Sequence, residues 1–453
     1  MGDASRRAEG PELSVSIATT PTWVRHAVLW HVYPLGFLGA PSQGDPKVHP
    51  VPRLRGLVPW LDHLIELGAN ALLLGPVFQS ETHGYDTSDY FRIDTRLGND
   101  ADFDHLVEQA HARGIRLVLD GVFNHVSRSF PPFRDAVAQG PKSPHHDWFR
   151  WDRNGEAHVF EGHQQLVSLN HDNPAVADHV AQVMRHWSTR GVDGWRLDAA
   201  YAVPTSFWAQ VCGRLRAELP DVWLLGEVIH GDYTAVVAEA GLHSVTQYEL
   251  WKAIWSALND RNLFELAHAL QRHDALLEQF TPQTFIGNHD VTRIASRLDD
   301  PGHLPHALAV LFTVGGVPSI YSGDEQGLLG VKENRIGGDD AIRPTFPTTP
   351  GPLPASRARV LRLHQELIAL RRRHPWLHQA RTAVEHLTNT TLLYRADGAD
   401  GEQLLVILNL DNRPASARAP GGGWTAEAGN ATASATELSV PAYGWGVWSR
   451  TQH

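Results

Sequence analysis

Eight strand-like apolar segments alternate with helix-like segments between residues 28 and 373, and this alternation limits the fold more than any other feature of the chain. The segments are near-continuous apolar runs, as is typical of parallel strands buried on both faces. Eight parallel strands joined by helices predict an α/β fold of the (β/α)8 TIM barrel type. The predicted strands are VLWHVYPL (28–35), NALLLGPV (70–77), IRLVLDGV (115–122), VDGWRLDA (192–199), VWLLGEV (222–228), SVTQYEL (244–250), TFIGNHD (284–290) and VPSIYSG (317–323).

Two of the intervening segments carry a clear helical pattern. Residues 57–68 (LVPWLDHLIELG) have apolar side chains at three- and four-residue spacing, which indicates one buried helical face. Residues 102–114 (DFDHLVEQAHARG) are predicted to form a second helix. Both segments end at a glycine, Gly68 and Gly114, and glycine commonly terminates helices because it tolerates the left-handed conformation.

Two further segments interrupt this rhythm and predict additional domains. Residues 126–173 follow the third strand and are too long for a simple connection, so they predict a small inserted domain. Residues 376–453 contain short strand-like runs separated by Gly, Asn, Asp and Pro, which predict an all-β sandwich domain. The barrel then comprises residues 26–125 and 174–375, preceded by an N-terminal tail of residues 1–25.

Composition restricts the partners and the compartment. The net charge of −11 argues against a nucleic acid partner. No segment reaches the roughly 18 consecutive apolar residues of a membrane helix, so we expect no membrane association. Arg6 and Arg7 precede no apolar segment of the kind found in signal peptides. Cys212 is the only cysteine and excludes an intrachain disulfide, and together these features predict a cytoplasmic protein.

Acidic and basic residues gather at the carboxyl ends of four predicted strands. The motifs are DGVFNH (120–125), GWRLDAA (194–200), LLGEV (224–228) and GNHD (287–290). The active sites of such barrels lie at this end. Each motif alone has an ordinary structural explanation, such as an ion pair on a strand or a turn that closes it. Their joint occurrence in this order is much more specific.

The residue types in these motifs point to cleavage of glycosidic bonds. Arg196 and Asp198 are two residues apart on a strand and share one face, so the guanidinium is expected to lower the pKa of the carboxyl, as a carboxylate nucleophile requires. Glu227 follows an apolar run that is expected to keep it protonated. A carboxylate paired with a carboxylic acid is the arrangement of retaining glycosidases. Asp290 is a third acid that could bind sugar hydroxyls.

These motifs, together with HGYDTSDYFRID (83–94) and GVPSIYSGDE (316–325), resemble those of the α-amylase family, glycoside hydrolase family 13, and the resemblance extends from about Ala27 to the C-terminus. It implies that Asp198 is the nucleophile, Glu227 the general acid/base and Asp290 the transition-state stabiliser. It also identifies the insertion as the family's domain B and the C-terminal segment as its β-sandwich domain. The sugar-binding residues that it implies at the cleavage point are Arg196, His125, His289 and Tyr85, with Asp86 nearby.

Two further segments refine the resemblance. Residues 166–176 (LVSLNHDNPAV) are most similar to the neopullulanase and cyclomaltodextrinase-like group, although only about 25 residues precede the first strand and the N-terminal domain of that group does not fit there. Residues 337–347 (GGDDAIRPTFP) resemble a late loop of the family, in which Asp339 or Asp340 and Arg343 would hold the terminal glucose unit. A loop-stabilising ion pair is an equally good interpretation of Arg343.

No obligatory cofactor is expected. Asn124 matches a calcium ligand of many family members, and Asp147 or Asp152 could contribute oxygens. Calcium needs six to eight oxygen ligands, however, and no dense acidic loop supplies them. Calcium bound through Asn124 therefore stays an alternative to a metal-free enzyme. The histidines of the insertion match no compact zinc signature.

The sequence thus predicts a retaining α-glycosidase that hydrolyses α-1,4-glucosidic bonds of maltooligosaccharides or maltodextrins through a covalent glycosyl-enzyme intermediate. The expected partner is an α-glucan oligosaccharide. A transglycosylase on the same scaffold is the alternative, because a sugar hydroxyl could replace water in the second step. A non-catalytic carbohydrate-binding protein is disfavoured because all three carboxyl groups are present. The preferred chain length, tolerance of α-1,6 bonds and oligomeric state are left open.

Overall fold

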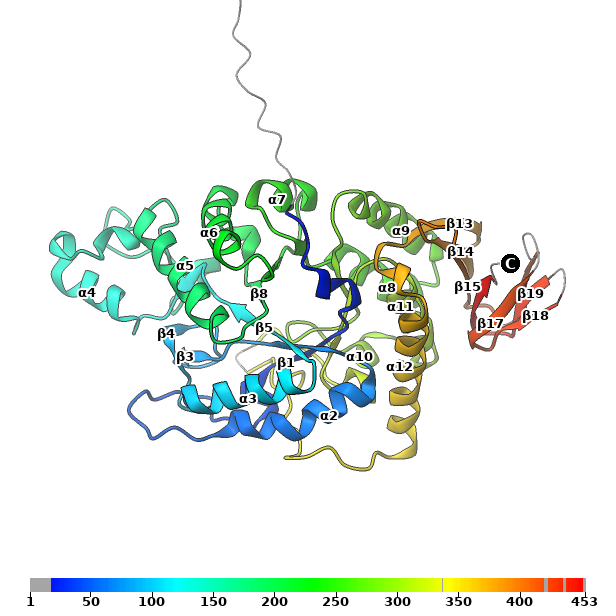
Figure 1. Ribbon diagram of the computed structural model, residues 1–453, viewed down its shortest axis with the longest axis horizontal. Coiled ribbons are helices and arrows are strands. Elements are labelled where there is room, and N and C mark those ends of the chain that lie inside the picture. The colour runs from blue at the N-terminus through cyan, green and yellow to red at the C-terminus, as the bar shows by residue number, and fades with distance from the viewer. Residues whose placement is uncertain (1–17, 336, 419–422, 435–436, 451–453) are drawn as a thin grey trace, which may run out of the picture.

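The computed structural model describes residues 18–335, 337–418, 423–434 and 437–450 (Figure 1). Most of the predicted N-terminal tail, including Arg6 and Arg7, lies outside the described residues. Within the described part of the chain, no helix combines the length and apolarity needed to cross a membrane.

The central sheet is a closed barrel of eight parallel strands. Its strands follow the order β10-β9-β8-β5-β2-β1-β12-β11, and an isolated parallel bridge between Thr246 and Gln283 joins the two outer strands. The predicted TIM barrel is therefore confirmed. Its strands are β1 (Leu29–Val32), β2 (Ala71–Leu74), β5 (Arg116–Gly121), β8 (Gly194–Leu197), β9 (Trp223–Gly226), β10 (Ser244–Val245), β11 (Gln283–Phe285) and β12 (Val317–Tyr321).

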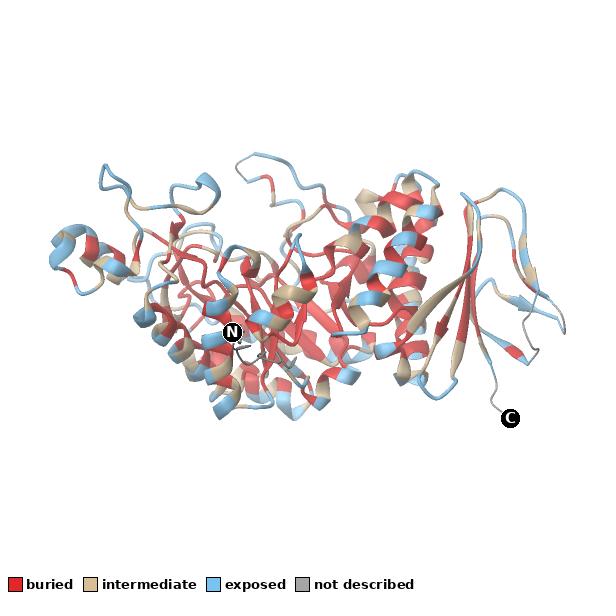
Figure 2. Cartoon of the chain, turned by 90° about the horizontal axis from the view of Figure 1, so that it is seen from above, coloured by how far each residue is buried: buried red, intermediate tan, exposed pale blue. Residues whose placement is uncertain are grey.

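Helices surround these strands, and their outer faces are exposed whereas the strands are buried (Figure 2). As predicted, Gly68 ends α2 in the left-handed conformation, with φ 95°. The longer helices are α2 (Val58–Leu67), α3 (Asp100–Ala112), α4 (Pro131–Gln139), α5 (Pro174–Ser188), α6 (Thr205–Glu218), α7 (Tyr233–Ala240), α8 (Tyr248–Asn259), α9 (Leu263–Leu277), α11 (Leu304–Thr313) and α12 (Ala355–Arg373). Short turns include α1 (Pro34–Phe37), α10 (Ile294–Arg297) and the 3-10 helices η1 (Thr22–His26), η2 (Arg53–Leu57), η3 (Gly140–Lys142), η4 (His146–Trp148), η5 (Phe160–Gly162), η6 (Ala200–Ala202), η7 (Pro301–His303), η8 (Asp324–Gln326) and η9 (Pro375–Gln379).

All eight barrel strands are shorter than predicted, and the two shortest differ for identifiable local reasons. Strand 244–250 ends at Val245, and Tyr248 begins α8. The reason is local, because the Gln247 side chain accepts a hydrogen bond from the Leu250 amide and caps the helix. Strand 284–290 likewise ends at Phe285, so the GNHD motif lies in the loop that follows. Both corrections move chemically important residues off the strands and onto the carboxyl-end surface.

The segment after the third barrel strand and the C-terminal segment form separate structures. In the former, β6 (His125–Val126) pairs antiparallel with β7 (Val167–Ser168), and α4 and the turns between them project away from the barrel at the left of Figure 1. A two-stranded sheet, β3 (Phe78–Ser80) and β4 (Thr87–Ile93), precedes it. We propose the bounds 126–173 for this insertion.

The C-terminal segment contains a five-stranded sheet, β13-β14-β15-β20-β17, and a three-stranded sheet, β16-β19-β18, at the right of Figure 1. All their pairings are antiparallel, which confirms the predicted all-β domain. We propose the bounds 376–453 for it. Its strands are β13 (Arg381–Leu387), β14 (Thr391–Asp397), β15 (Gln403–Asn409), β16 (Ala415–Arg418), β17 (Trp424–Gly429), β18 (Thr432–Ala433), β19 (Glu437–Val440) and β20 (Trp445–Arg450).

Asp193 links the starts of two neighbouring barrel strands. Its carboxylate is 2.7 Å from Arg116 Nη1 and 2.8 Å from His111 Nε2, and it accepts a hydrogen bond of 2.9 Å from the Leu117 amide. The side chain is only 10% exposed. Although burial acts in the opposite direction, His111, the Leu117 amide and Arg116 hold the pKa of Asp193 below its usual value.

We predict that Asp193→Asn lowers the free energy of unfolding by about 2 kcal/mol at pH 7, because a largely buried acceptor of charge-assisted hydrogen bonds is lost. A depressed native-state pKa stabilises the fold above the unfolded pKa of about 3.9, and that contribution disappears as the pH falls through the native value. The difference between the two proteins should therefore shrink in acid. Urea unfolding at several pH values measures it.

The matched control is Asp62→Asn, whose ion pair with Arg113 leaves the carboxylate 63% exposed. Exposed pairs contribute less than about 1 kcal/mol. Equal losses in the two variants would contradict the role assigned to Asp193.

Candidate active site

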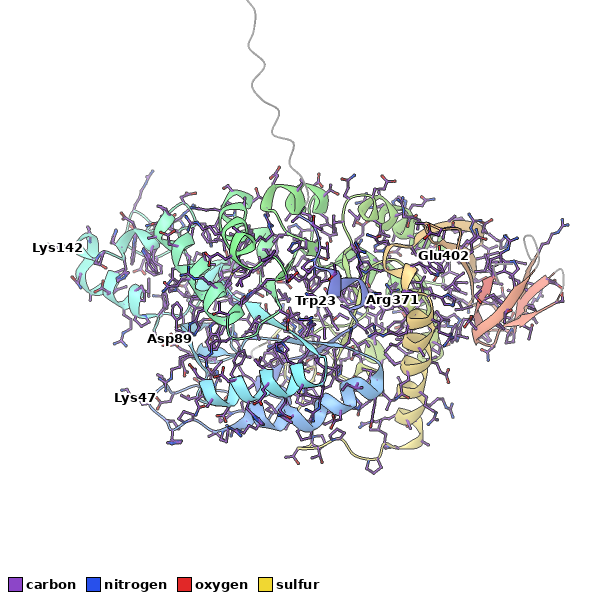
Figure 3. All side chains as sticks on the ribbon, in the orientation of Figure 1. Trp23, Lys47, Asp89, Lys142, Arg371 and Glu402 are labelled. Carbon is purple, nitrogen blue, oxygen red and sulfur yellow. The ribbon has the colours of Figure 1, made fainter. Side chains whose placement is uncertain are left out.

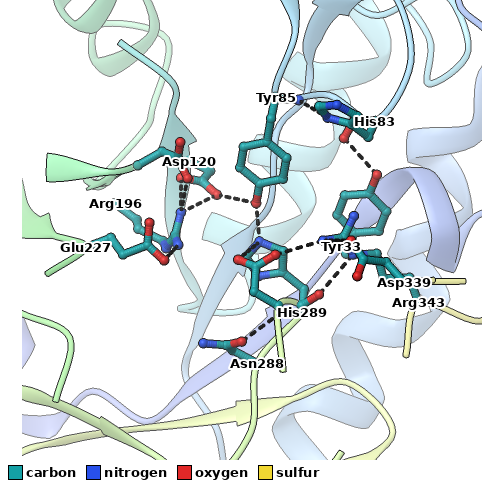
Figure 4. A network of polar contacts seen from close by, with 12 residues as sticks. Tyr33, His83, Tyr85, Asp120, Arg196, Glu227, Asn288, His289, Asp339 and Arg343 are labelled. Carbon is teal, nitrogen blue, oxygen red and sulfur yellow. Dashed lines mark hydrogen bonds and ion pairs between the residues drawn. The ribbon is translucent and has the colours of Figure 1, made fainter. Parts of the chain in front are cut away.

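One guanidinium, that of Arg196 on β8, holds three carboxyl groups from three strands (Figure 4). Its Nη1 atom lies 2.7 Å and 2.8 Å from the two carboxylate oxygens of Asp120 on β5 and 3.2 Å from Oδ1 of Asp198. Its Nη2 atom lies 2.6 Å from Oε1 of Glu227, which follows β9. All four side chains are buried. The structure therefore brings Arg196, Asp198 and Glu227 together as predicted and adds Asp120.

The predicted low pKa of Asp198 is wrong. Burial, followed by the charges of Glu227 and Asp120, raises the pKa of Asp198 well above its usual value, and Arg196 opposes this only in part. The sequence places one arginine beside one aspartate, whereas the fold divides that arginine among three acids. Burial also raises the pKa of Asp120 despite its contact with Arg196. The cluster consequently retains a proton at a pH where isolated carboxyl groups are ionised.

The predicted apolar environment of Glu227 is also wrong. In addition to Arg196, its carboxyl accepts hydrogen bonds from the Ala199 amide (3.0 Å) and the Tyr248 hydroxyl (3.1 Å). Ala199 has φ 45°, a left-handed conformation uncommon for alanine, immediately after Asp198. Tyr248 in turn accepts a hydrogen bond of 2.9 Å from the Asn288 side chain. Glu227 is thus held in one orientation by three donors.

Asp290 lies in a different electrostatic environment. Its Oδ2 atom is 2.9 Å from His289 Nε2, and its Oδ1 atom is 2.8 Å from Arg343 Nη2. Although burial acts to raise the pKa of Asp290, His289 and Arg343 hold it well below the usual value. Asp290 is therefore ionised, and its side chain remains 31% exposed and accessible to a ligand.

Arg343 forms the ion pair that was the alternative interpretation of this residue. Its Nη2 atom also lies 3.0 Å from Asp339 Oδ2, so the loop and Asp290 share one cation. The side chain of Asp340 is exposed, and the contact of this residue with Arg343 is made by its backbone carbonyl, 3.2 Å from the Arg343 amide. Of the two predicted acids, Asp339 is the one that reaches the network.

Tyr85 joins the two halves of the network. Its hydroxyl donates a hydrogen bond of 3.0 Å to Asp120 Oδ2 and also contacts His289 Nε2 (Figure 4). Its ring lies parallel to the His289 ring, with 5.5 Å between the ring centroids. Burial and the charge of Asp120 raise the pKa of Tyr85 well above its usual value, so the hydroxyl keeps its proton.

His125 and Asp86, two other predicted site residues, are both buried but have different hydrogen-bond partners. His125 is buried against Phe160, with ring centroids 4.9 Å apart, and among the described residues its Nε2 atom has no hydrogen-bond partner. Burial lowers the pKa of His125 to about 3, so the ring is neutral. Asp86 is buried, and both its carboxylate oxygens accept hydrogen bonds from Thr82. Asp86 organises its own loop, and no contact found in the described structure links it to the other site residues.

The residues considered as calcium ligands, Asn124, Asp147 and Asp152, do not converge on one point in the described structure. No three His, Cys, Asp or Glu side chains among them are grouped so that they could hold a metal ion. The Asn124 amide faces its neighbour His125, with 3.1 Å between Nδ2 and Nδ1. Asp152 accepts hydrogen bonds from the amides of its own turn, and Asp147 is exposed. Asn124 and Asp152 thus contact their own neighbours, and no contact among the described residues brings them together with Asp147 into one set of ligands.

Sequence inspection missed Asp120, Tyr248 and Tyr33. Asp120 lies opposite Arg196 in the parallel register of β5 and β8. Its position near the carboxyl end of the third strand could therefore have identified it as a site residue. The Tyr33 ring lies parallel to that of His289, and the Arg343 guanidinium lies 4.6 Å from its centroid. Tyr33 carried no comparable signal, because its partners are distant in the sequence.

The chain is similar to known carbohydrate-active enzymes. It is 32% identical to a cyclomaltodextrinase from Bacillus sp over 350 residues, and 31% identical to neopullulanase 2 from Thermoactinomyces vulgaris over 351 residues. These alignments cover 70% of this chain but only 62% and 59% of the relatives, so the chain spans about three fifths of their length. The predicted resemblance to this group is confirmed.

Solved structures show the same fold. The acarbose-soaked debranching enzyme from Nostoc punctiforme superposes with a TM-score of 0.80 at 26% identity, covering 96% of this chain and all of the other. The cyclic α-maltosyl-(1→6)-maltose hydrolase from Arthrobacter globiformis gives 0.80 at 25% identity, with 95% and 100% coverage. The family description "Alpha amylase, catalytic domain" matches residues 31–351. The chain therefore belongs to the α-amylase family.

Proposed function

We propose that this protein is a retaining glycosidase that hydrolyses α-1,4-glucosidic bonds of maltooligosaccharides through a covalent intermediate on Asp198. The observation that carries the proposal is the Arg196 cluster, in which the two terminal nitrogens of one guanidinium contact Asp198 and Glu227 at 3.2 Å and 2.6 Å. Two carboxyl groups held by one guanidinium suit a mechanism that needs a nucleophile and an acid/base side by side. Asp290, ionised and partly exposed, supplies the third acid.

The proton retained by the cluster is central to this mechanism. In the first step a carboxylate oxygen of Asp198 bonds to the anomeric carbon, the bond to the leaving sugar breaks, and Glu227 donates its proton to the leaving oxygen. In the second step Glu227 takes a proton from water, whose oxygen bonds to the anomeric carbon and releases Asp198. The raised pKa of Asp198 favours a proton in the cluster before the sugar binds, and the first step requires Asp198 to be ionised and Glu227 to be the proton donor.

The substrate class rests on the site and on the names of the relatives. Those names include cyclomaltodextrinase, neopullulanase 2 and the intracellular maltogenic amylase of Bacillus subtilis, which support a linear or cyclic α-glucan oligosaccharide as substrate and a cytoplasmic location. Neutral His125 and protonated Tyr85 suit hydrogen bonding to sugar hydroxyls. The remaining proposed sugar-binding residues are Asp86, Arg196, His289, Asp339, Asp340 and Arg343.

Product analysis tests this function directly. We predict that maltotriose, maltoheptaose and a cyclodextrin yield only products of lower mass or opened rings, whereas trehalose is unchanged, when released sugars are separated by chromatography over time. Products longer than the starting sugar would instead establish the transglycosylase. The absence of any reaction with all four sugars would refute the proposed substrate class.

Replacement of the nucleophile gives a second prediction. Asp198→Asn removes the attacking carboxylate and should lower turnover of maltoheptaose by about 10⁴-fold or more, because no covalent intermediate can form. Circular dichroism should show an unchanged fold. Asp172→Asn, which alters an exposed ion pair with Arg150 on the insertion, is the control and should retain full turnover. Substantial activity in Asp198→Asn would exclude Asp198 as the nucleophile.

The pKa directions in the cluster give a third prediction. Asp120 raises the pKa of Asp198, and Arg196 lowers it. Asp120→Asn removes one negative charge and frees Arg196 for Asp198, so both effects lower the pKa of the nucleophile. The acid limb of the pH profile of kcat/KM should therefore move to lower pH by about one unit. An unmoved acid limb, or one at higher pH, would contradict the proposed charge sharing.

A further inference from the structure

A small cavity lies at the amino-terminal end of the barrel, the end opposite the carboxyl-end cluster. It lies where Val28 leads into β1 and Gly316 leads into β12, and its volume is about 30 Å³. No aspartate or glutamate lines it. Figure 3 labels Trp23 and Arg371, which mark this region on η1 and α12. The basic residues that line the cavity are Arg25, His26, Arg371, Arg372 and His378.

Arg371 is a buried cation without an acidic partner in the described structure. Its guanidinium donates hydrogen bonds to the carbonyl oxygens of Val314 (2.8 Å) and Gly316 (2.6 Å), and longer ones to Phe312 and Leu377. The residue is only 7% exposed. Burial and the neighbouring Arg372 lower the pKa of Arg371 to about 9. Carbonyl dipoles satisfy the hydrogen-bonding groups but supply no full opposite charge.

His378 contributes an unused hydrogen-bonding group to the same cavity. It is 7% exposed, and among the described residues its ring has no hydrogen-bond or ion-pair partner. Burial and the charges of Arg371, Arg25 and His26 lower the pKa of His378 to about 3. The neutral ring therefore keeps one N–H group that can donate to a ligand, in a region where the surrounding field is positive.

We propose that this cavity binds one small monatomic anion of the chloride type, held by Arg25, Arg371 and His378. The positive lining selects for negative charge, and the neutral histidine supplies a directed donor. The volume holds about two water molecules, at roughly 10–15 Å³ each, which suits a single monatomic ion. The ion would connect η1, the end of α12 and η9 to the start of β12, and thereby stabilise the base of the barrel.

Thermal unfolding in matched salts tests this site. At constant ionic strength and pH 7, replacing sodium gluconate by sodium chloride or bromide should raise the Tm by about 2 °C and then saturate, whereas phosphate should not. Arg25→Gln removes an exposed cation from the cavity and should abolish the saturable rise, with His378→Asn as a second variant. Arg153→Gln changes the net charge equally on the insertion and should respond like the unmodified protein.

Diffraction from crystals grown in sodium bromide gives a direct readout, because bromide scatters anomalously. An anomalous peak among Arg25, Arg371 and His378 is the expected result. The same Tm in gluconate and chloride, a chloride response that survives in Arg25→Gln, or the absence of the bromide peak would overturn the proposal. None of these measurements depends on sugar cleavage, so their failure leaves the proposed glycosidase function unaffected.

Discussion

The sharing of the Arg196 guanidinium among Asp120, Asp198 and Glu227 is the interaction on which the site depends. Each partner comes from a different strand, so the charge balance is set by the register of the barrel. In that register Asp120 lies opposite Arg196, and Leu225, two residues before Glu227, lies on the other side. A slip of one strand by one residue would turn its acid away from the guanidinium. The charge balance of the site therefore depends directly on the strand register of the barrel.

Two aspartates of the same site are driven to opposite protonation states by their surroundings. Asp198, buried beside other acids, has a raised pKa, whereas Asp290, between His289 and Arg343, has a lowered one. Tyr85 connects the two environments through its protonated hydroxyl. Two chemically identical side chains of one site therefore have pKa values shifted in opposite directions, as the different tasks of the proposed mechanism require.

The sequence predicted the parts of the fold that depend on local pattern. The long apolar runs located all eight strands but overestimated their lengths. The two-residue β10 could not be distinguished from the helix start at Tyr248, because the helix begins where the Gln247 side chain caps it. The candidate acids were found because they follow apolar runs. The protonation states of these acids could not be predicted, because the groups that shift their pKa values are distant in the sequence. These groups are Asp120 and Glu227 for Asp198, and Arg343 for Asp290.

The number of paired residues between neighbouring strands differs around the barrel. Most neighbouring strands pair over several residues, but β10 and β11 meet through the single bridge between Thr246 and Gln283. Local opening is favoured where backbone pairing is sparsest, so we expect the barrel wall to open most easily at this junction. Tyr248 and Asn288, which orient Glu227, lie just beyond it. The orientation of Glu227 therefore depends on residues beside the most weakly paired junction of the barrel, whereas Asp198 follows β8, which is paired on both sides.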